Sequence, residues 1–94
     1  SQFITIKGKG FTDILLEELA ENDNIKYIKP ERSRKEDVLK VYVSEGLRTD
    51  KISRLSGDCV TTLVTNKARV TSVTPPELDL EEAFLKLIKK GGEE

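Results

Sequence analysis

The sequence predicts a single α+β domain, and three observations lead to this prediction. Its 94 residues suit one domain, since domains typically hold about 100–150 residues. Apolar residues make up 36% of the chain, which is enough for a small core and argues against a disordered chain. Stretches with a period of two alternate with stretches of helical period, in the order β-α-β-β-α-β followed by a third helix.

The N-terminal part predicts a strand and a helix. Residues 3–7 are β-branched and apolar, and we expect Gly8-Lys9-Gly10 to end this strand as a turn. Thr12 is placed to cap the helix that follows, because its hydroxyl can accept from an early backbone N–H. The apolar side of this helix is predicted to comprise Ile14, Leu15, Leu16, Leu19 and Ala20. Residues 22–24 are expected to end it.

Two further strands are predicted over residues 25–29 and 38–43. In the second of them one face carries Leu39, Val41 and Val43, and the other carries Val38, Lys40 and Tyr42. This period of two is typical of a sheet with one face in the core. The charged residues 30–37 between the strands are expected to be a solvent-exposed hairpin loop.

A second helix is predicted to begin near Thr49. Its buried seam recurs at intervals of three and four residues: Ile52, Leu55, Cys59 and Leu63. Gly57 lies within this seam and weakens the helix by about 1 kcal/mol relative to alanine. The helix therefore stops near Ser56 or continues to Asn66, and we favour continuation with Asn66 as a left-handed cap.

The C-terminal part predicts a strand and a third helix. The strand covers residues 68–74 and is expected to end at Pro75-Pro76. Asp79 and Glu82 have the spacing of a capping box at the start of the helix. An apolar stripe then follows the helical period: Leu80, Ala83, Phe84, Leu87 and Ile88. This helix can cover an edge or part of the open face of the sheet.

The first six elements predict a ferredoxin-like βαββαβ sandwich, in which an antiparallel four-stranded sheet carries two helices on one face. The third, C-terminal helix is an addition to this fold. We expect residues 1–94 to form one domain.

The composition argues against several functions. Sixteen basic and 17 acidic residues leave no basic excess for nucleic-acid binding. The chain has no His and a single Cys, so we expect no catalytic site, no metal site and no cofactor. No apolar run reaches the roughly 18 residues of a membrane span, and we expect no direct membrane insertion.

Individual motifs have simple structural explanations. Gly8-Lys9-Gly10 matches neither a dinucleotide fingerprint nor a phosphate-binding loop. Cys59 is expected to be a small buried apolar side chain rather than a nucleophile. The strand over residues 38–43 lacks the glycines and paired aromatics of RNA-binding domains, so no stacking platform is expected from the aromatic residues, which are Phe3, Phe11, Tyr27, Tyr42 and Phe84.

Residues 76–88 resemble the tail of ATP-binding subunits of exporter-type ABC transporters that carry a small C-terminal accessory domain. Such subunits commonly end in a strand, a Pro and a pattern like [S/T/D]-LE-[E/D]-x-F-L-x-L, and here Asp79 is followed by Leu-Glu-Glu-Ala-Phe-Leu-Lys-Leu. Residues 68–73 are similar to the last strand of the family. The resemblance implies an accessory domain with this order of elements. Because the chain also enters a strand within two residues of Ser1, we expect it to be part of a longer protein.

The resemblance implies that ATP and Mg²⁺ belong to the parent protein, upstream of this domain. The implied partners are the nucleotide-binding domain, its dimer mate and a membrane permease subunit, on the cytoplasmic side of the membrane. A homodimer is a further expectation, by analogy with other ferredoxin-like folds. Phe84, Leu85 and Ile88 are the candidate interaction residues, since Leu85 lies off the main stripe and needs a second partner; alternatively, Leu85 is a solitary exposed apolar residue.

A second function is consistent with the same fold. Ferredoxin-like domains often dimerise or hold small molecules, so the alternative is a small-molecule-sensing or dimerisation domain. An enzyme is the least favoured hypothesis, because the sequence shows no general base and no nucleophile with residues that could activate it.

Overall fold

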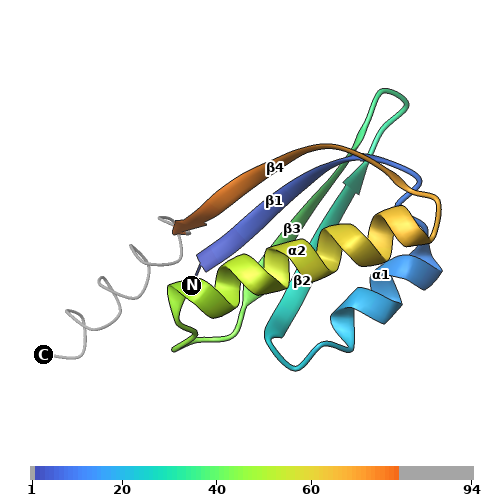
Figure 1. The fold of residues 1–94 in the computed structure, drawn as a ribbon. Helices are drawn as coiled ribbons and strands as arrows, with labels where there is room; N and C mark the ends of the chain where they lie inside the picture. The colour runs from blue at the N-terminus through green and yellow to red at the C-terminus, as the bar shows by residue number, and fades with distance from the viewer. Residues whose placement is uncertain (1, 79–94) are drawn as a thin grey trace, which may run out of the picture.

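The structure, a computed structural model, describes residues 2–78, which form a four-stranded sheet and two helices (Figure 1). In chain order the elements are β1 (Gln2–Lys9), α1 (Asp13–Ala20), β2 (Ile25–Arg32), β3 (Asp37–Val43), α2 (Thr49–Thr65) and β4 (Arg69–Leu78). The α+β class and the order of these six elements are confirmed. The helix predicted from Asp79 lies outside the described residues.

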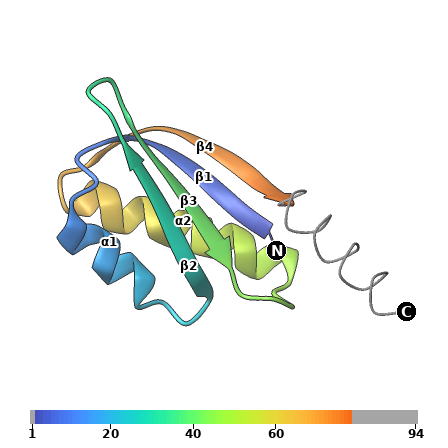
Figure 2. The same cartoon turned by 180° about the vertical axis from the view of Figure 1, so that it is seen from behind.

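The sheet is antiparallel throughout, with strand order β2-β3-β1-β4. Strands β1 and β2 are connected through α1 and run parallel, with β3 inserted between them. Strands β3 and β4 are connected through α2 and run parallel, with β1 inserted between them. Two βαβ units are therefore interleaved, and both helices lie on the same side of the sheet (Figures 1 and 2).

The core lies between the sheet and the two helices. Strand β1 contributes Ile4 and Ile6, and β3 contributes Leu39, Val41 and Val43. The helices contribute Leu15, Leu16, Leu19, Ile52, Leu55, Cys59 and Leu63. The predicted inward face of residues 38–43 and the predicted seam of the second helix are both confirmed.

Helix α1 is capped as predicted, since the Thr12 hydroxyl accepts from the backbone N–H of Leu15 at 3.4 Å. Its predicted apolar side is too wide, because Ile14 is 77% exposed and Ala20 is also exposed. A helix of eight residues lying on a sheet buries only a narrow strip. The helix ends at Ala20, earlier than residues 22–24.

Helix α2 begins at Thr49, as predicted, and runs through Gly57 without interruption. Gly57 is on the exposed side, so the buried seam on the opposite side continues across it. The left-handed residue at its C-terminal end is Lys67, with φ of 71°, whereas Asn66 has φ of −96°. The prediction of Asn66 as a left-handed cap is therefore wrong by one residue.

The strands are longer than predicted. Gly8 and Lys9 belong to β1, and only Gly10, with φ of +82°, forms the turn. Strand β2 continues to Arg32, so the hairpin loop is confined to residues 33–36 rather than residues 30–37. Strand β4 runs through Pro75 and Pro76, which the sequence predicts as its end. The two prolines lie in an edge strand, at a shift in its register against β1 between Thr74 and Glu77, and both edge strands and such irregularities tolerate proline.

Asp37 opens β3 and is buried, contrary to its predicted place in an exposed loop. Its carboxylate accepts from the backbone N–H of Phe11 at 3.2 Å and lies 3.9 Å from the Lys9 ammonium. These contacts satisfy the buried carboxylate and hold the connection between β1 and α1 against β3.

Gly8 allows the close approach of β4 to β1. A Cβ atom at Gly8 would lie 1.8 Å from the Arg69 carbonyl oxygen, whereas a Cβ atom at Gly57 would meet nothing within 4 Å. We predict that Gly8→Ala lowers the free energy of unfolding by about 1–3 kcal/mol through this clash. Gly57→Ala should raise it by about 0.5–1 kcal/mol, because alanine favours the helix. Urea denaturation measures both, and equal effects of the two substitutions would contradict the packing of β4 on β1.

Candidate functional site

The candidate site is the sheet face opposite the helices, called the open face below. None of the helices within residues 2–78 covers it (Figure 2). The strand registers arrange its residues in three rows across the sheet, each given from β4 to β2. The first row is Glu77, Phe3, Tyr42 and Tyr27; the second is Thr74, Thr5, Lys40 and Lys29; the third is Ser72, Lys7, Val38 and Glu31.

The aromatic rings of the first row contact one another. The Tyr27 and Tyr42 rings are stacked, with centroids 4.4 Å apart and planes 15° from parallel. The Phe3 and Tyr42 centroids are 5.2 Å apart at 34°. Only 2% of Tyr42 and 8% of Phe3 is exposed, so this aromatic row is a second, smaller packed layer on the side away from the core.

Two lysines of the second row lie over these rings. The Lys29 ammonium is 5.1 Å from the Tyr42 centroid and 5.7 Å from the Tyr27 centroid. The Lys40 ammonium is 5.1 Å from the Phe3 centroid. Each distance is within the range of a cation–π interaction. The lysine residues themselves are exposed, so the open face carries positive charge above its aromatic layer.

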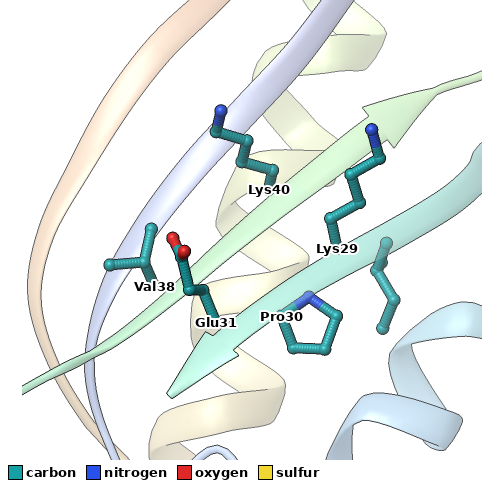
Figure 3. Close-up of a pocket in the computed structure, with 6 residues that line it drawn as sticks. Lys29, Pro30, Glu31, Val38 and Lys40 are labelled. Atoms are coloured by element: carbon teal, nitrogen blue, oxygen red, sulfur yellow. The ribbon is translucent and has the colours of Figure 1, made fainter. Parts of the chain in front are cut away.

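A shallow hollow of about 470 Å³ lies on the β2–β3 hairpin beside the lysines. Its lining comprises Ile28, Lys29, Pro30, Glu31, Val38 and Lys40. Figure 3 shows Lys29, Glu31, Val38 and Lys40 in front of the two strands, with a helix behind them. The lining of the hollow therefore combines aliphatic side chains with charged groups of both signs.

Two chemical features of residues 2–78 bear on the site: the cysteine, and the grouping of His, Cys, Asp and Glu side chains. Burial raises the pKa of the Cys59 thiol from 9.0 to about 11, and the negative charge of Asp58 adds to this effect. The thiol is therefore protonated at neutral pH and is a poor nucleophile. Within the same residues no three His, Cys, Asp or Glu side chains come together as metal ligands.

The predicted interaction residues lie outside the described part of the chain: Phe84, Leu85 and Ile88. Three of the aromatic residues contact one another, which the sequence analysis does not anticipate: Phe3, Tyr27 and Tyr42. The sequence places Tyr42 on the correct face of its strand. Pairing it with Tyr27 requires the register shift between Ile25 and Tyr27, which no local pattern indicates.

No protein-family model matches the chain, and no curated protein is similar to it. Among residues 2–78, neither helix is long and apolar enough to cross a membrane.

We predict that Cys59 makes stability fall in alkaline solution. The pKa of this thiol is raised in the folded state. The contribution of the protonated thiol to the free energy of unfolding is therefore fully present below pH 9 and is lost as pH rises through about 11. The full loss is about 2–3 kcal/mol, from 1.36 kcal/mol per pKa unit. Urea denaturation between pH 8 and pH 11 should show a steeper decline for the native chain than for Cys59→Ala. Parallel profiles would show that Cys59 is not buried as described.

We also predict that the stacked tyrosines are energetically coupled. A double-mutant cycle with Tyr27→Leu and Tyr42→Leu should give a coupling free energy of about 0.5–1.5 kcal/mol. Tyr27→Leu paired with Val64→Ala is the control, because Val64 is an exposed residue of α2, on the other side of the sheet. Additive effects in the tyrosine cycle would contradict the stacking.

Proposed function

We propose that this chain is a non-catalytic accessory domain of an ABC transporter ATP-binding protein. Its role in that protein is interaction or regulation. ATP and Mg²⁺ are held by the nucleotide-binding domain of the parent protein, and transport is driven there.

The observation that carries the proposal is the position of β4 relative to the C-terminal pattern. Strand β4 ends at Leu78, and the pattern that resembles the transporter subunits begins at the next residue, Asp79. The resemblance implies a last strand, a proline and then this pattern; here residues 75–78 lengthen the approach, and β4 runs through them up to the residue before the pattern. The strand also pairs with central strand β1, so the pattern directly follows an integral part of the sheet.

The fold supports the same proposal. Two interleaved βαβ units, an antiparallel sheet and two helices on one face are the features expected of a ferredoxin-like sandwich. We assign the chain to that class. A small domain of this kind leaves one sheet face available for contacts, which suits a domain that binds a neighbouring surface.

The side-chain chemistry favours binding over catalysis. The chain has no His, and the thiol of its one Cys is protonated at neutral pH. The proposed partners are the parent's nucleotide-binding domain, its dimer mate and the permease subunit, with the domain on the cytoplasmic side. Acyl or phosphoryl transfer needs an activated nucleophile or positioned charges, whereas a domain that only binds its neighbours needs neither.

Two measurements test this function. Calorimetry of the 94-residue chain with Mg-ATP should detect no binding, because the proposal places the nucleotide site in the parent. Deleting the domain from the parent protein should leave ATP binding intact and change assembly or the coupling of hydrolysis to transport. Tight ATP binding by the chain alone would contradict the proposal, as would a parent gene that encodes no GxxxxGK[ST] loop.

The hollow beside Lys29 and Lys40 favours one alternative, a small-molecule-sensing domain. The two ammonium groups could bind an anionic metabolite, with Val38 providing apolar contact. A specific metabolite should then raise the melting temperature by roughly 4–8 °C per kcal/mol of binding free energy. Lys29→Ala should remove that shift, and an unchanged melting temperature across a panel of anionic metabolites would reject this alternative.

A further inference from the structure

Strand β2 forms one edge of the sheet, and α1 packs beside it on the helix-covered side (Figure 1). An edge strand presents backbone groups with which another extended chain can pair. On β2 their direction follows from the hairpin to β3, where the Ser33 N–H donates to the Glu36 carbonyl at 3.1 Å. Because hydrogen-bonded and non-hydrogen-bonded pairs alternate along an antiparallel ladder, Ile28, Pro30 and Arg32 direct their backbone groups away from β3.

Pro30 is consistent with this assignment. It has no N–H to donate to β3, and proline in an edge strand places its nitrogen on the outer side. The outer edge of β2 therefore offers the N–H groups of Ile28 and Arg32 and the carbonyl groups of all three residues. Within residues 2–78 no other strand covers this edge.

A second hollow, of about 290 Å³, lies between β2 and α1 and is called the α1 hollow below. Its lining is mostly aliphatic and comprises Asp13, Leu16, Glu17, Ala20, Ile28 and Pro30. Asp13 is paired with Arg32, with an oxygen and a nitrogen atom 2.6 Å apart, whereas Glu17 forms no ion pair within residues 2–78. The α1 hollow therefore suits a side chain with an aliphatic stem and a cationic end, as in lysine or arginine.

The hollow on the open face lies on the other side of the same strand. It is also lined by Ile28 and Pro30, and it adds Lys29 and Lys40, which pair with each other across β2 and β3 (Figure 3). Two ammonium groups against the single carboxylate of Glu31 leave its lining with a net positive charge. It therefore suits a carboxylate side chain, to which the lysines can donate.

A second copy of β2 is a poor occupant of this edge. Each strand carries Lys26, Lys29 and Arg32 against Glu31 alone, so pairing two of them brings like charges together. Pro30 also removes one hydrogen-bond donor from each strand. The charges of the two hollows thus favour a different segment.

We propose that the outer edge of β2 binds an extended segment of a partner protein in which a Lys or Arg is adjacent to an Asp or Glu. Successive side chains of a strand point to opposite faces, so one of these residues lies over the α1 hollow and its neighbour over the hollow on the open face. Backbone hydrogen bonds to Ile28 and Arg32 hold the segment, and the two hollows select its charge pattern. This binding site is a property of β2 and α1 and does not depend on the proposed function.

NMR titration of the 94-residue chain with two peptides, each capped at both ends, tests the proposal. The first peptide, Thr-Val-Lys-Glu-Val-Thr, has its charges on adjacent residues and therefore on opposite faces of a strand. The second, Thr-Lys-Val-Glu-Val-Thr, has the same composition but both charges on one face. The first should shift the backbone amide signals of Ile28 and Arg32. The second should bind about two- to fivefold more weakly, because no register satisfies both of its charges.

Matched substitutions locate the bound peptide. Glu17→Gln should weaken binding of the first peptide by about two- to fivefold, the range of an exposed ion pair. Glu18→Gln is the control, since Glu18 is the next residue of α1, is also exposed and lines neither hollow. It should leave the affinity unchanged.

Four results would overturn the proposal. The first is unshifted signals of Ile28 and Arg32 at peptide concentrations up to about 5 mM. The second is equal effects of the two peptides or of the two substitutions. The third is shifts of similar size along β4, which would show nonspecific pairing with either edge of the sheet. The fourth is a dependence of the Ile28 and Arg32 signals on protein concentration without peptide, which would identify a second copy as the occupant.

Discussion

The register of central strand β1 is the constraint on which the rest of the structure depends. Paired on both sides, β1 directs Ile4 and Ile6 into the core and Phe3 and Thr5 to the open face. Gly8 extends this pairing, because a side chain there would clash with the backbone of β4. A slip of one residue would exchange the two faces of β1 and disrupt both packed layers.

Because this register determines which side chains lie on each side of the sheet, the two sides differ in composition. The helix-covered side is apolar and uniform, and it accounts for the stability of a small domain. The open side carries aromatic rings under lysine ammonium groups. Holding the long lysine side chains over the rings costs conformational entropy, which the cation–π contacts offset. The proposed function assigns contacts with a neighbouring domain to this face.

Much of the architecture follows from local sequence patterns. Alternation over residues 38–43 and the seam through Cys59 predict their elements and buried faces, because period alone distinguishes strand from helix. Strand ends are predicted less well. Pro75 and Pro76 lie in an edge strand at a shift in its register against β1, and the buried Asp37 carboxylate has the Phe11 N–H and the Lys9 ammonium as partners. Both facts depend on neighbours that are remote in sequence.

The candidate site is harder to predict for the same reason. Tyr42 can be placed on the open face from its own strand, but Phe3 and Tyr27 join it only through pairings between separate strands. The shift in register before Tyr27 adds one residue that no propensity indicates. The tail pattern, by contrast, is local and can be found in the sequence directly.

Ring-to-ring nuclear Overhauser contacts in the 94-residue chain test the central claim most directly. The described register requires contacts between the Phe3 and Tyr42 rings and between the Tyr42 and Tyr27 rings, at centroid separations of 5.2 and 4.4 Å. Contacts of Tyr42 with the methyl groups of Ile4 or Ile6 in place of these would show a slipped register, and the account of both faces would then be wrong.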